Sequence, residues 1–208
     1  MGRIMFSLLT SLLMVCSVSA NMTDSDIDII DPVPQGAVFT VRKSPVLYFY
    51  LSPATSAEIR FTLVDTRQLP PVAEFVLPSP ARPGFVPIRF ADHHLVLEED
   101  VQYRWYVSVM RDPKSHASDI VAGGMIERVD PRLVDYYGQS CDLDSVPQAA
   151  KAGLWIDAFA CLNELIEASP ENEKLRRLRE RLWRDREFNI NELPGAATGR
   201  RPDCPPVC

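Results

Sequence analysis

Asp92, His93 and His94 form the one cluster in the chain whose residue types suggest catalysis. Carboxylate and imidazole side chains bind divalent metals, so this triplet would suit a metal-dependent hydrolase. Such a site needs further ligands from other loops, yet His116 is the only other histidine in the sequence. We therefore expect the triplet to occupy an exposed loop between two strands, and the metal-dependent hydrolase is kept as the alternative.

The other familiar catalytic motifs are absent from the sequence. It contains no Gly-x-Ser-x-Gly nucleophile turn, no His-Glu-x-x-His zinc motif and no glycine-rich phosphate loop. Gly123 and Gly124 are adjacent within a strand pattern, where we expect a bulge rather than a ligand cradle. We therefore expect no bound metal or cofactor, and we favour a non-catalytic protein.

Two aromatic residues and one acid are the candidate interaction surface: Trp155, Asp157 and Tyr106. Tyr106 is predicted to point outward from a strand beside Arg104, where it could bind a sugar or a peptide. Trp155 lies near the start of a predicted helix and is expected to pack against a second helix. The alternative places Trp155 on the surface, as an anchor for a partner.

The N-terminal residues are typical of a secretory signal peptide. Arg3 supplies positive charge, residues 4–15 form an apolar run, and the following small residues end in Ala20. We expect cleavage after Ala20, a mature chain in the periplasm or outside the cell, and no integral membrane segment in that mature chain. The net charge of −6 argues against a nucleic-acid partner, which would require a basic face.

The cysteines that follow the signal peptide can form disulfides in an oxidising compartment. Cys161 falls on the apolar face of a predicted helix, where we expect a buried free thiol. Cys204 and Cys208 are the candidate disulfide, which would close a small ring at the end of the chain. We expect at most one bridge, involving Cys204, Cys208 or Cys141, with Cys161 unpaired.

Apolar and polar residues alternate along several segments between residues 36 and 130. Residues 101–109 show the pattern of a strand with one buried face. Residues 46–51 are continuously apolar or aromatic, which predicts a strand covered on both sides, and Pro87 predicts an edge strand. These short strands favour an immunoglobulin-like β-sandwich over residues 36–130, preceded by the signal peptide (1–20) and a flexible leader (21–35).

The apolar period becomes that of a helix in the C-terminal region. The spacing of Gly153, Trp155, Ala158 and Pro170 matches one tetratricopeptide unit. We therefore expect a tetratricopeptide-like helical hairpin over residues 131–188, followed by a disordered tail over residues 189–208 that carries Cys204 and Cys208. The expected fold class is α+β, a sandwich followed by a hairpin.

The order of these segments resembles a bacterial family, domain-of-unknown-function family 928, found mostly in cyanobacteria and some proteobacteria. The matching pieces are residues 45–51, 61–65, 83–86, 103–105, 124–129 and, most specifically, Gly153-Leu154-Trp155-Ile156-Asp157-Ala158. Members often carry a cysteine where this chain has Arg111, and the Cys-Pro-Pro-Val-Cys end is not part of the pattern. The resemblance implies an exported bacterial protein and brings no established activity.

Taken together, these features favour an exported, non-catalytic interaction or scaffold protein of the bacterial cell envelope, with an envelope protein as its partner. Two alternatives of other classes stay open. One is an envelope enzyme, in the specific form of a metal-dependent hydrolase at Asp92, His93 and His94. The other is a carbohydrate-binding module that uses outward aromatic residues.

Overall fold

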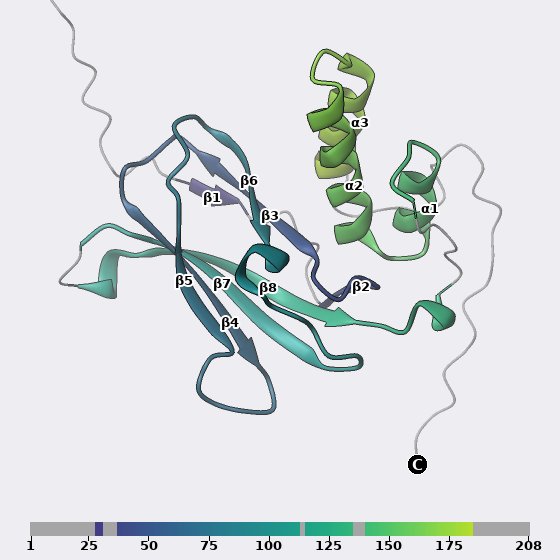
Figure 1. Cartoon of the computed structure of the whole chain (residues 1–208). Helices are drawn as coiled ribbons and strands as arrows, with labels where there is room; N and C mark the ends of the chain where they lie inside the picture. Colours follow the sequence, from purple (N-terminus) through teal and green to yellow (C-terminus); the bar gives the residue numbers. More distant parts are fainter. Residues whose placement is uncertain (1–27, 31–36, 113–114, 135–139, 185–208) are drawn as a thin grey trace, which may run out of the picture.

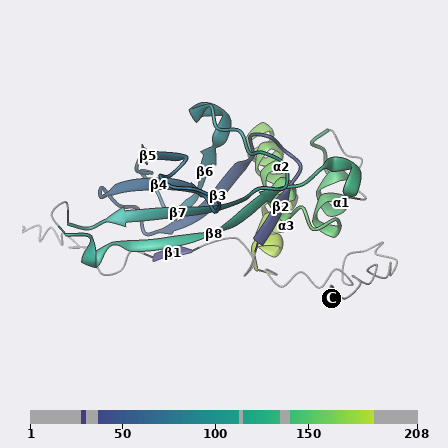
Figure 2. The same ribbon diagram turned by 90° about the horizontal axis from the view of Figure 1, so that it is seen from below.

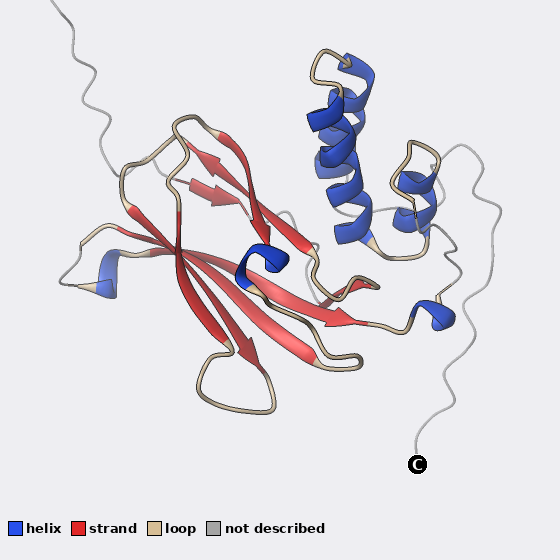
Figure 3. Cartoon of the chain, viewed as in Figure 1, coloured by secondary structure: helices blue, strands red, loops and turns tan. Residues whose placement is uncertain are grey.

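Strands come first along the chain and the α-helices follow, with short 3₁₀ helices between some of the strands, as Figures 1 and 3 show for the computed structural model. The structure describes residues 28–30, 37–112, 115–134 and 140–184. The strands are β1 (Asp28–Ile30), β2 (Ala37–Thr40), β3 (Val46–Ser52), β4 (Glu58–Asp65), β5 (Ala73–Leu77), β6 (Gly84–Arg89), β7 (Gln102–Met110) and β8 (Ile120–Arg128). The α-helices are α1 (Ser145–Lys151), α2 (Trp155–Ala168) and α3 (Glu173–Arg184). The predicted α+β class is confirmed.

The strands form two sheets. One sheet has three antiparallel strands in the order β1-β3-β6, and the other has five strands in the order β2-β8-β7-β4-β5. In the five-stranded sheet β2 runs parallel to β8, and the other pairs are antiparallel. β6 lies at the edge of its sheet, as Pro87 predicted, because proline cannot donate a hydrogen bond to a further strand.

The two sheets share one apolar core. Alternate side chains of β4 and β7, such as Phe61 and Trp105, are fully buried, and Phe49 of β3 joins the same core cluster from the smaller sheet. Each fully buried Leu, Ile, Val or Phe stabilises the fold by about 1.5–3 kcal/mol. The alternation expected from the sequence therefore describes the inner faces of both sheets correctly.

β3 is covered on both sides, as its continuous apolar run predicted. Leu47, Phe49 and Leu51 face the sandwich core, whereas Tyr48 and Tyr50 lie on the opposite face of the strand. The helices stand beside β2 and β3 at one end of the sandwich, away from β4 and β5, in both ribbon views (Figures 1 and 2). The outer face of the three-stranded sheet is therefore a docking surface for α2 and α3.

The leader expected over residues 21–35 contains a strand. Residues 28–30 form β1, which pairs antiparallel with β3, so this part of the expected flexible leader belongs to the three-stranded sheet. The signal peptide, the cleavage site after Ala20, and the tail with Cys204 and Cys208 lie outside the described residues. Within the described residues, no helix has the length and apolar character needed to cross a membrane.

Gly123 and Gly124 lie in a regular part of β8 and do not form the expected bulge. They pair one-to-one with Tyr106 and Trp105 of β7. A Cβ atom on Gly123 would lie only 2.4 Å from the carbonyl oxygen of Trp105 and 3.0 Å from the ring of Tyr106. The glycine is therefore required by the close approach of β7, and the Tyr106 ring covers it.

Replacing Gly123 by alanine tests this close approach. Gly123→Ala is expected to lower the free energy of unfolding by about 1–3 kcal/mol, because the added methyl group overlaps the backbone of β7. In an unobstructed strand the same change would stabilise the protein by about 0.5–1 kcal/mol. Val121→Ala, on the same strand and exposed, is the control and should change stability by less than about 0.5 kcal/mol. Chemical denaturation measures both, and a Gly123→Ala protein at least as stable as the original contradicts the interpretation.

Cys161 is paired, which corrects the expectation of a free thiol. It forms a disulfide with Cys141, whose Cα atom lies 5.3 Å away. The helical pattern placed Cys161 correctly on a buried face, but it contained no information about which segment covers that face. The chain before α1 covers it and brings Cys141 into bonding distance.

The disulfide is expected to stabilise the helical region. The two cysteines are 20 residues apart. Closing a loop of that length reduces the conformational entropy of the unfolded chain and so raises its free energy by about 3 kcal/mol. The double variant Cys141→Ser/Cys161→Ser should therefore unfold with a free energy lower by about 2–4 kcal/mol, whereas Cys204→Ser/Cys208→Ser serves as the matched control. Alkylation of the unreduced protein followed by mass spectrometry checks the pairing, and labelling of Cys141 or Cys161 in that sample would contradict it.

Candidate functional site

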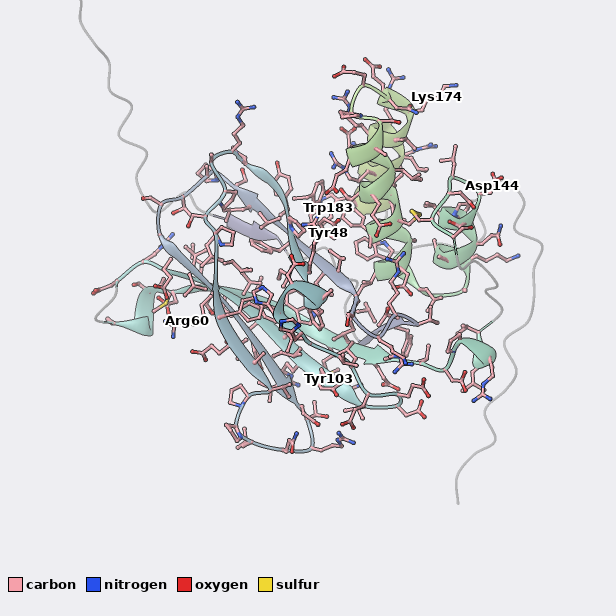
Figure 4. All side chains as sticks on the ribbon, in the orientation of Figure 1. Tyr48, Arg60, Tyr103, Asp144, Lys174 and Trp183 are labelled. Carbon is pink, nitrogen blue, oxygen red and sulfur yellow. A yellow bond between two sulfur atoms is a disulfide. The ribbon has the colours of Figure 1, made fainter. Side chains whose placement is uncertain are left out.

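A cleft of about 890 Å³ lies between the outer face of the three-stranded sheet and the helices α2 and α3. We call it the sheet–hairpin cleft. β3 and β6 supply one wall, and α2 and α3 supply the other. Figure 4 labels Tyr48 and Trp183 in this region, where β3 faces the helices. Its volume falls within the range of about 300–1,000 Å³ that is typical of small-molecule sites.

Aromatic rings from both walls meet in the cleft. Trp183 of α3 lies 4.6 Å from Phe85 of β6 and 5.9 Å from Tyr50 of β3, measured between ring centroids. Tyr50 and Phe85 are cross-strand partners with their rings 5.1 Å apart. Edge-to-face ring pairs of this kind are favourable and leave parts of the ring faces accessible. All three side chains are only partly buried and line the cleft.

Arg179 places a positive charge in the same cleft. Its guanidinium lies 4.7 Å above the Phe85 ring, and its Nη1 donates a hydrogen bond to Asn163 Oδ1 at 3.0 Å. Asn163 is itself held in place because its Nδ2 donates to the Phe159 carbonyl oxygen at 2.8 Å. Burial lowers the pKa of Arg179, and no carboxylate among the described residues forms an ion pair with it. The guanidinium is thus oriented by an amide and a ring, not neutralised by an acid.

Tyr48 and two glutamates complete the polar lining. Burial, followed by the charge of Glu167, raises the pKa of Tyr48 to about 12, so its hydroxyl stays protonated at neutral pH. Glu167 is ion-paired with Arg89 of β6 at 3.1 Å across the two walls. Glu180 lies exposed at the rim. The cleft therefore offers hydrogen-bond donors and acceptors beside its aromatic rings.

Asp157 fixes the helices to the sandwich beside this cleft. It lies in the first turn of α2 and is 3% exposed. Its Oδ1 accepts a hydrogen bond from Thr40 Oγ1 at 2.6 Å, and its Oδ2 accepts one from the backbone N–H of Val41 at 3.0 Å. Desolvation by burial raises the pKa of Asp157, whereas these two hydrogen bonds oppose the rise. Both carboxylate oxygens are therefore used to hold β2.

Two of the three candidate interaction residues lie inside the molecule. Trp155 is 5% exposed and stacks on Phe159 with ring centroids 4.9 Å apart, and Asp157 is buried against β2. Asp157 therefore contributes to the internal contact between α2 and the sandwich, Trp155 contributes to the buried core, and neither side chain lies on an exposed surface. Tyr106 is partly buried and lies on the outer face of the five-stranded sheet, as predicted.

The Asp92-His93-His94 triplet is exposed: Asp92 and His93 end the 3₁₀ turn Phe90–His93, which follows β6, and His94 comes directly after it. The His93 ring stacks on Phe75 of β5 at 3.5 Å, and His94 adopts a left-handed backbone with φ of 55°. Within the described ranges, no group of three or more metal-ligating side chains comes together. The expected exposed position between two strands is confirmed.

Sequence reasoning missed the residues that line the cleft. Arg179 lies four residues after Leu175 and three before Leu182, which are both buried. A cation inside the apolar stripe of a helix was the available signal. Trp183 lies one turn further along the same face. No pattern in the sequence connects this face with Tyr50 and Phe85.

The fold and the cleft define an α+β protein in which a helical hairpin docks on a two-sheet sandwich and leaves a ligand-sized cleft between them. The family described as Domain of Unknown Function (DUF928) matches residues 18–193, and the chain belongs to this family. A search of curated proteins found no match. Among solved structures the chain is similar to the one described as "Crystal structure of Apo-form Calx CBD1 domain", with 14% sequence identity and a TM-score of 0.32. That alignment covers 50% of this chain and 98% of the other, and it adds nothing to the fold described above.

The buried Asp157 predicts a distinctive pH dependence. Its pKa is raised above the ordinary value of 3.8, so the folded protein holds this proton more tightly than the unfolded chain does. The resulting stabilisation is complete below the unfolded pKa and is lost as the pH rises through the folded pKa. The free energy of unfolding of the original protein, minus that of Asp157→Asn, should therefore increase on acidification, as measured by denaturation at several pH values.

Asp130 provides a control of opposite sign. Its hydrogen bonds with Arg132 lower its pKa to about 2, so its stabilisation is lost as the pH falls. The free energy of unfolding of the original protein, minus that of Asp130→Asn, should therefore decrease on acidification. A difference for Asp157→Asn that stays constant, or that follows the Asp130 trend, would show that Asp157 is not buried as a desolvated acid.

Proposed function

We propose that this chain is an exported, non-catalytic binding protein of the bacterial cell envelope and that its partner binds in the sheet–hairpin cleft. The observation that carries the proposal is the combination of accessible aromatic rings with the Arg179 guanidinium, which has no ion pair among the described residues. The two walls of the cleft are joined by the buried Asp157 contact and, more weakly, by the exposed Arg89–Glu167 ion pair. A preformed cleft of this kind is typical of binding sites.

The cleft supports binding better than catalysis. Its lining residues include no serine, cysteine, histidine or lysine, so a catalytic pair would have to come from its two glutamates. Glu167 is ion-paired with Arg89, and Glu180 is exposed to solvent. The geometry of the Asp92-His93-His94 turn does not favour the metal-dependent hydrolase, since His93 stacks on Phe75.

Two observations support export. The N-terminal residues have the pattern of a signal peptide with cleavage after Ala20. The Cys141–Cys161 disulfide is of a kind that persists in oxidising compartments such as the periplasm or the medium. We also propose that the hairpin is a single tetratricopeptide-like unit, supported by the spacing of Gly153, Trp155, Ala158 and Pro170. The apolar side of the hairpin packs on the sandwich. In an array of repeats the same side would pack on the next unit.

Site-specific photo-crosslinking in living bacteria tests the binding site. A photoreactive phenylalanine analogue is placed at Tyr50 or Trp183 in the full chain, and at Tyr106 as the matched control on the other sheet. We expect adducts with an envelope component from the two cleft positions and none from Tyr106. Adducts from Tyr106 alone would move the binding surface to the five-stranded sheet, and no adducts from Tyr50 or Trp183 would overturn the proposal.

A further inference from the structure

The formal charges of the residues that line the sheet–hairpin cleft balance, and Arg89, which pairs with Glu167, adds one positive charge beside them. Arg179 and Arg184 carry positive charge, and Glu167 and Glu180 carry negative charge, so the formal charges of its ionised lining cancel. A site for an anionic or cationic ligand would show an excess of the opposite sign. Neither sign is in strong excess, which favours a ligand that is polar but without net charge.

The polar groups of the cleft are planar and can form paired hydrogen bonds. The guanidinium of Arg179 presents several N–H donors in one plane, and carboxylates such as Glu180 present two acceptor oxygens. The protonated Tyr48 hydroxyl adds a group that can both donate and accept. Neighbouring hydroxyl groups on a sugar ring match such paired donors and acceptors. The C–H face of the same ring can pack on an aromatic side chain, whose face is partially negative.

The sheet edge beside the cleft argues against an extended peptide. A peptide that added a strand to β6 would need the backbone N–H groups of that edge. Pro87 lies in the middle of β6 and has no N–H to donate. The aromatic walls, the balanced charge and this interrupted edge all fit an oligosaccharide better.

We infer that the sheet–hairpin cleft binds a neutral oligosaccharide, with Tyr50 and Trp183 packing on sugar rings, Phe85 supporting both rings from behind, and Arg179 donating to sugar hydroxyls. This inference rests on the proposed function and names the chemical class of its ligand. It also assigns carbohydrate binding to the cleft and not to Tyr106 on the five-stranded sheet.

Tryptophan fluorescence and calorimetry with the purified mature protein test the inference. The probes are the neutral trisaccharides maltotriose, cellotriose and mannotriose, with trigalacturonate and trilysine as charged comparisons. We expect at least one neutral trisaccharide to bind with a Kd of about 1 mM or tighter. We also expect a fluorescence change that Trp183→Phe abolishes, because Trp105 and Trp155 are buried in the core and Trp183 lies in the cleft.

Variants locate the site. Trp183→Ala and Tyr50→Ala should each weaken binding at least about tenfold, and Trp183→Phe should retain most of it because a ring remains. Tyr106→Ala, with the same loss of an aromatic ring on the other sheet, should bind as the original protein does. Circular dichroism of each variant establishes that it is folded.

Three results would overturn the inference: no neutral trisaccharide binds, a charged probe binds more tightly than all of them, or Tyr106→Ala loses binding while Trp183→Ala keeps it. Crosslinking from Tyr50 and Trp183 that persists when no trisaccharide binds would leave the binding function standing and remove only the ligand class. Hydrolysis of a bound trisaccharide, detected by chromatography, would instead support the ligand class and overturn the non-catalytic function.

Discussion

The buried contact between Asp157 and β2 is the interaction on which the arrangement of this protein depends. A carboxylate that is 3% exposed is costly to bury, and it stays there because Thr40 and the Val41 N–H donate to its two oxygens. These donors come from the end of a strand that lies more than a hundred residues earlier in the sequence. The contact therefore joins the two halves of the chain. It also sets which end of α2 meets the sandwich.

The position of α2 then determines where the cleft forms. With its first turn fixed at β2, the helix runs along the outer face of β3, and Phe159 packs edge-on against Tyr48. Further along, Arg42 pairs with Glu164 and Arg89 pairs with Glu167, so charged contacts continue the interface where it becomes exposed. Exposed ion pairs stabilise weakly, by about 0.2–1 kcal/mol each, so they align the interface more than they hold it.

α3 completes the cleft because its apolar stripe is interrupted by a cation. Leu175 and Leu182 are buried, and Arg179 between them reaches over Phe85 and towards Asn163. The cation–π contact and the amide compensate in part for the desolvation of the guanidinium. The disulfide between Cys141 and Cys161 holds the chain before α1 against the far side of α2. Each face of α2 thus has a different partner: the sandwich, α3 or the disulfide-linked segment.

The sequence alone determined the local structure. Alternation predicted β4 and β7, the continuous apolar run of β3 predicted a strand buried on both faces, and Pro87 predicted the edge position of β6, because each depends only on the periodicity and chemistry of neighbouring residues. The family resemblance was likewise carried by short local segments.

The tertiary structure determined the features that the periodicity of the sequence cannot specify. Which segment covers Cys161, why Gly123 lacks a side chain, and whether Asp157 faces a partner or β2 all depend on contacts between distant parts of the chain. The cleft depends on such contacts most of all. Its rings and its cation come from β3, β6 and α3, and only the docking of the helices brings them together.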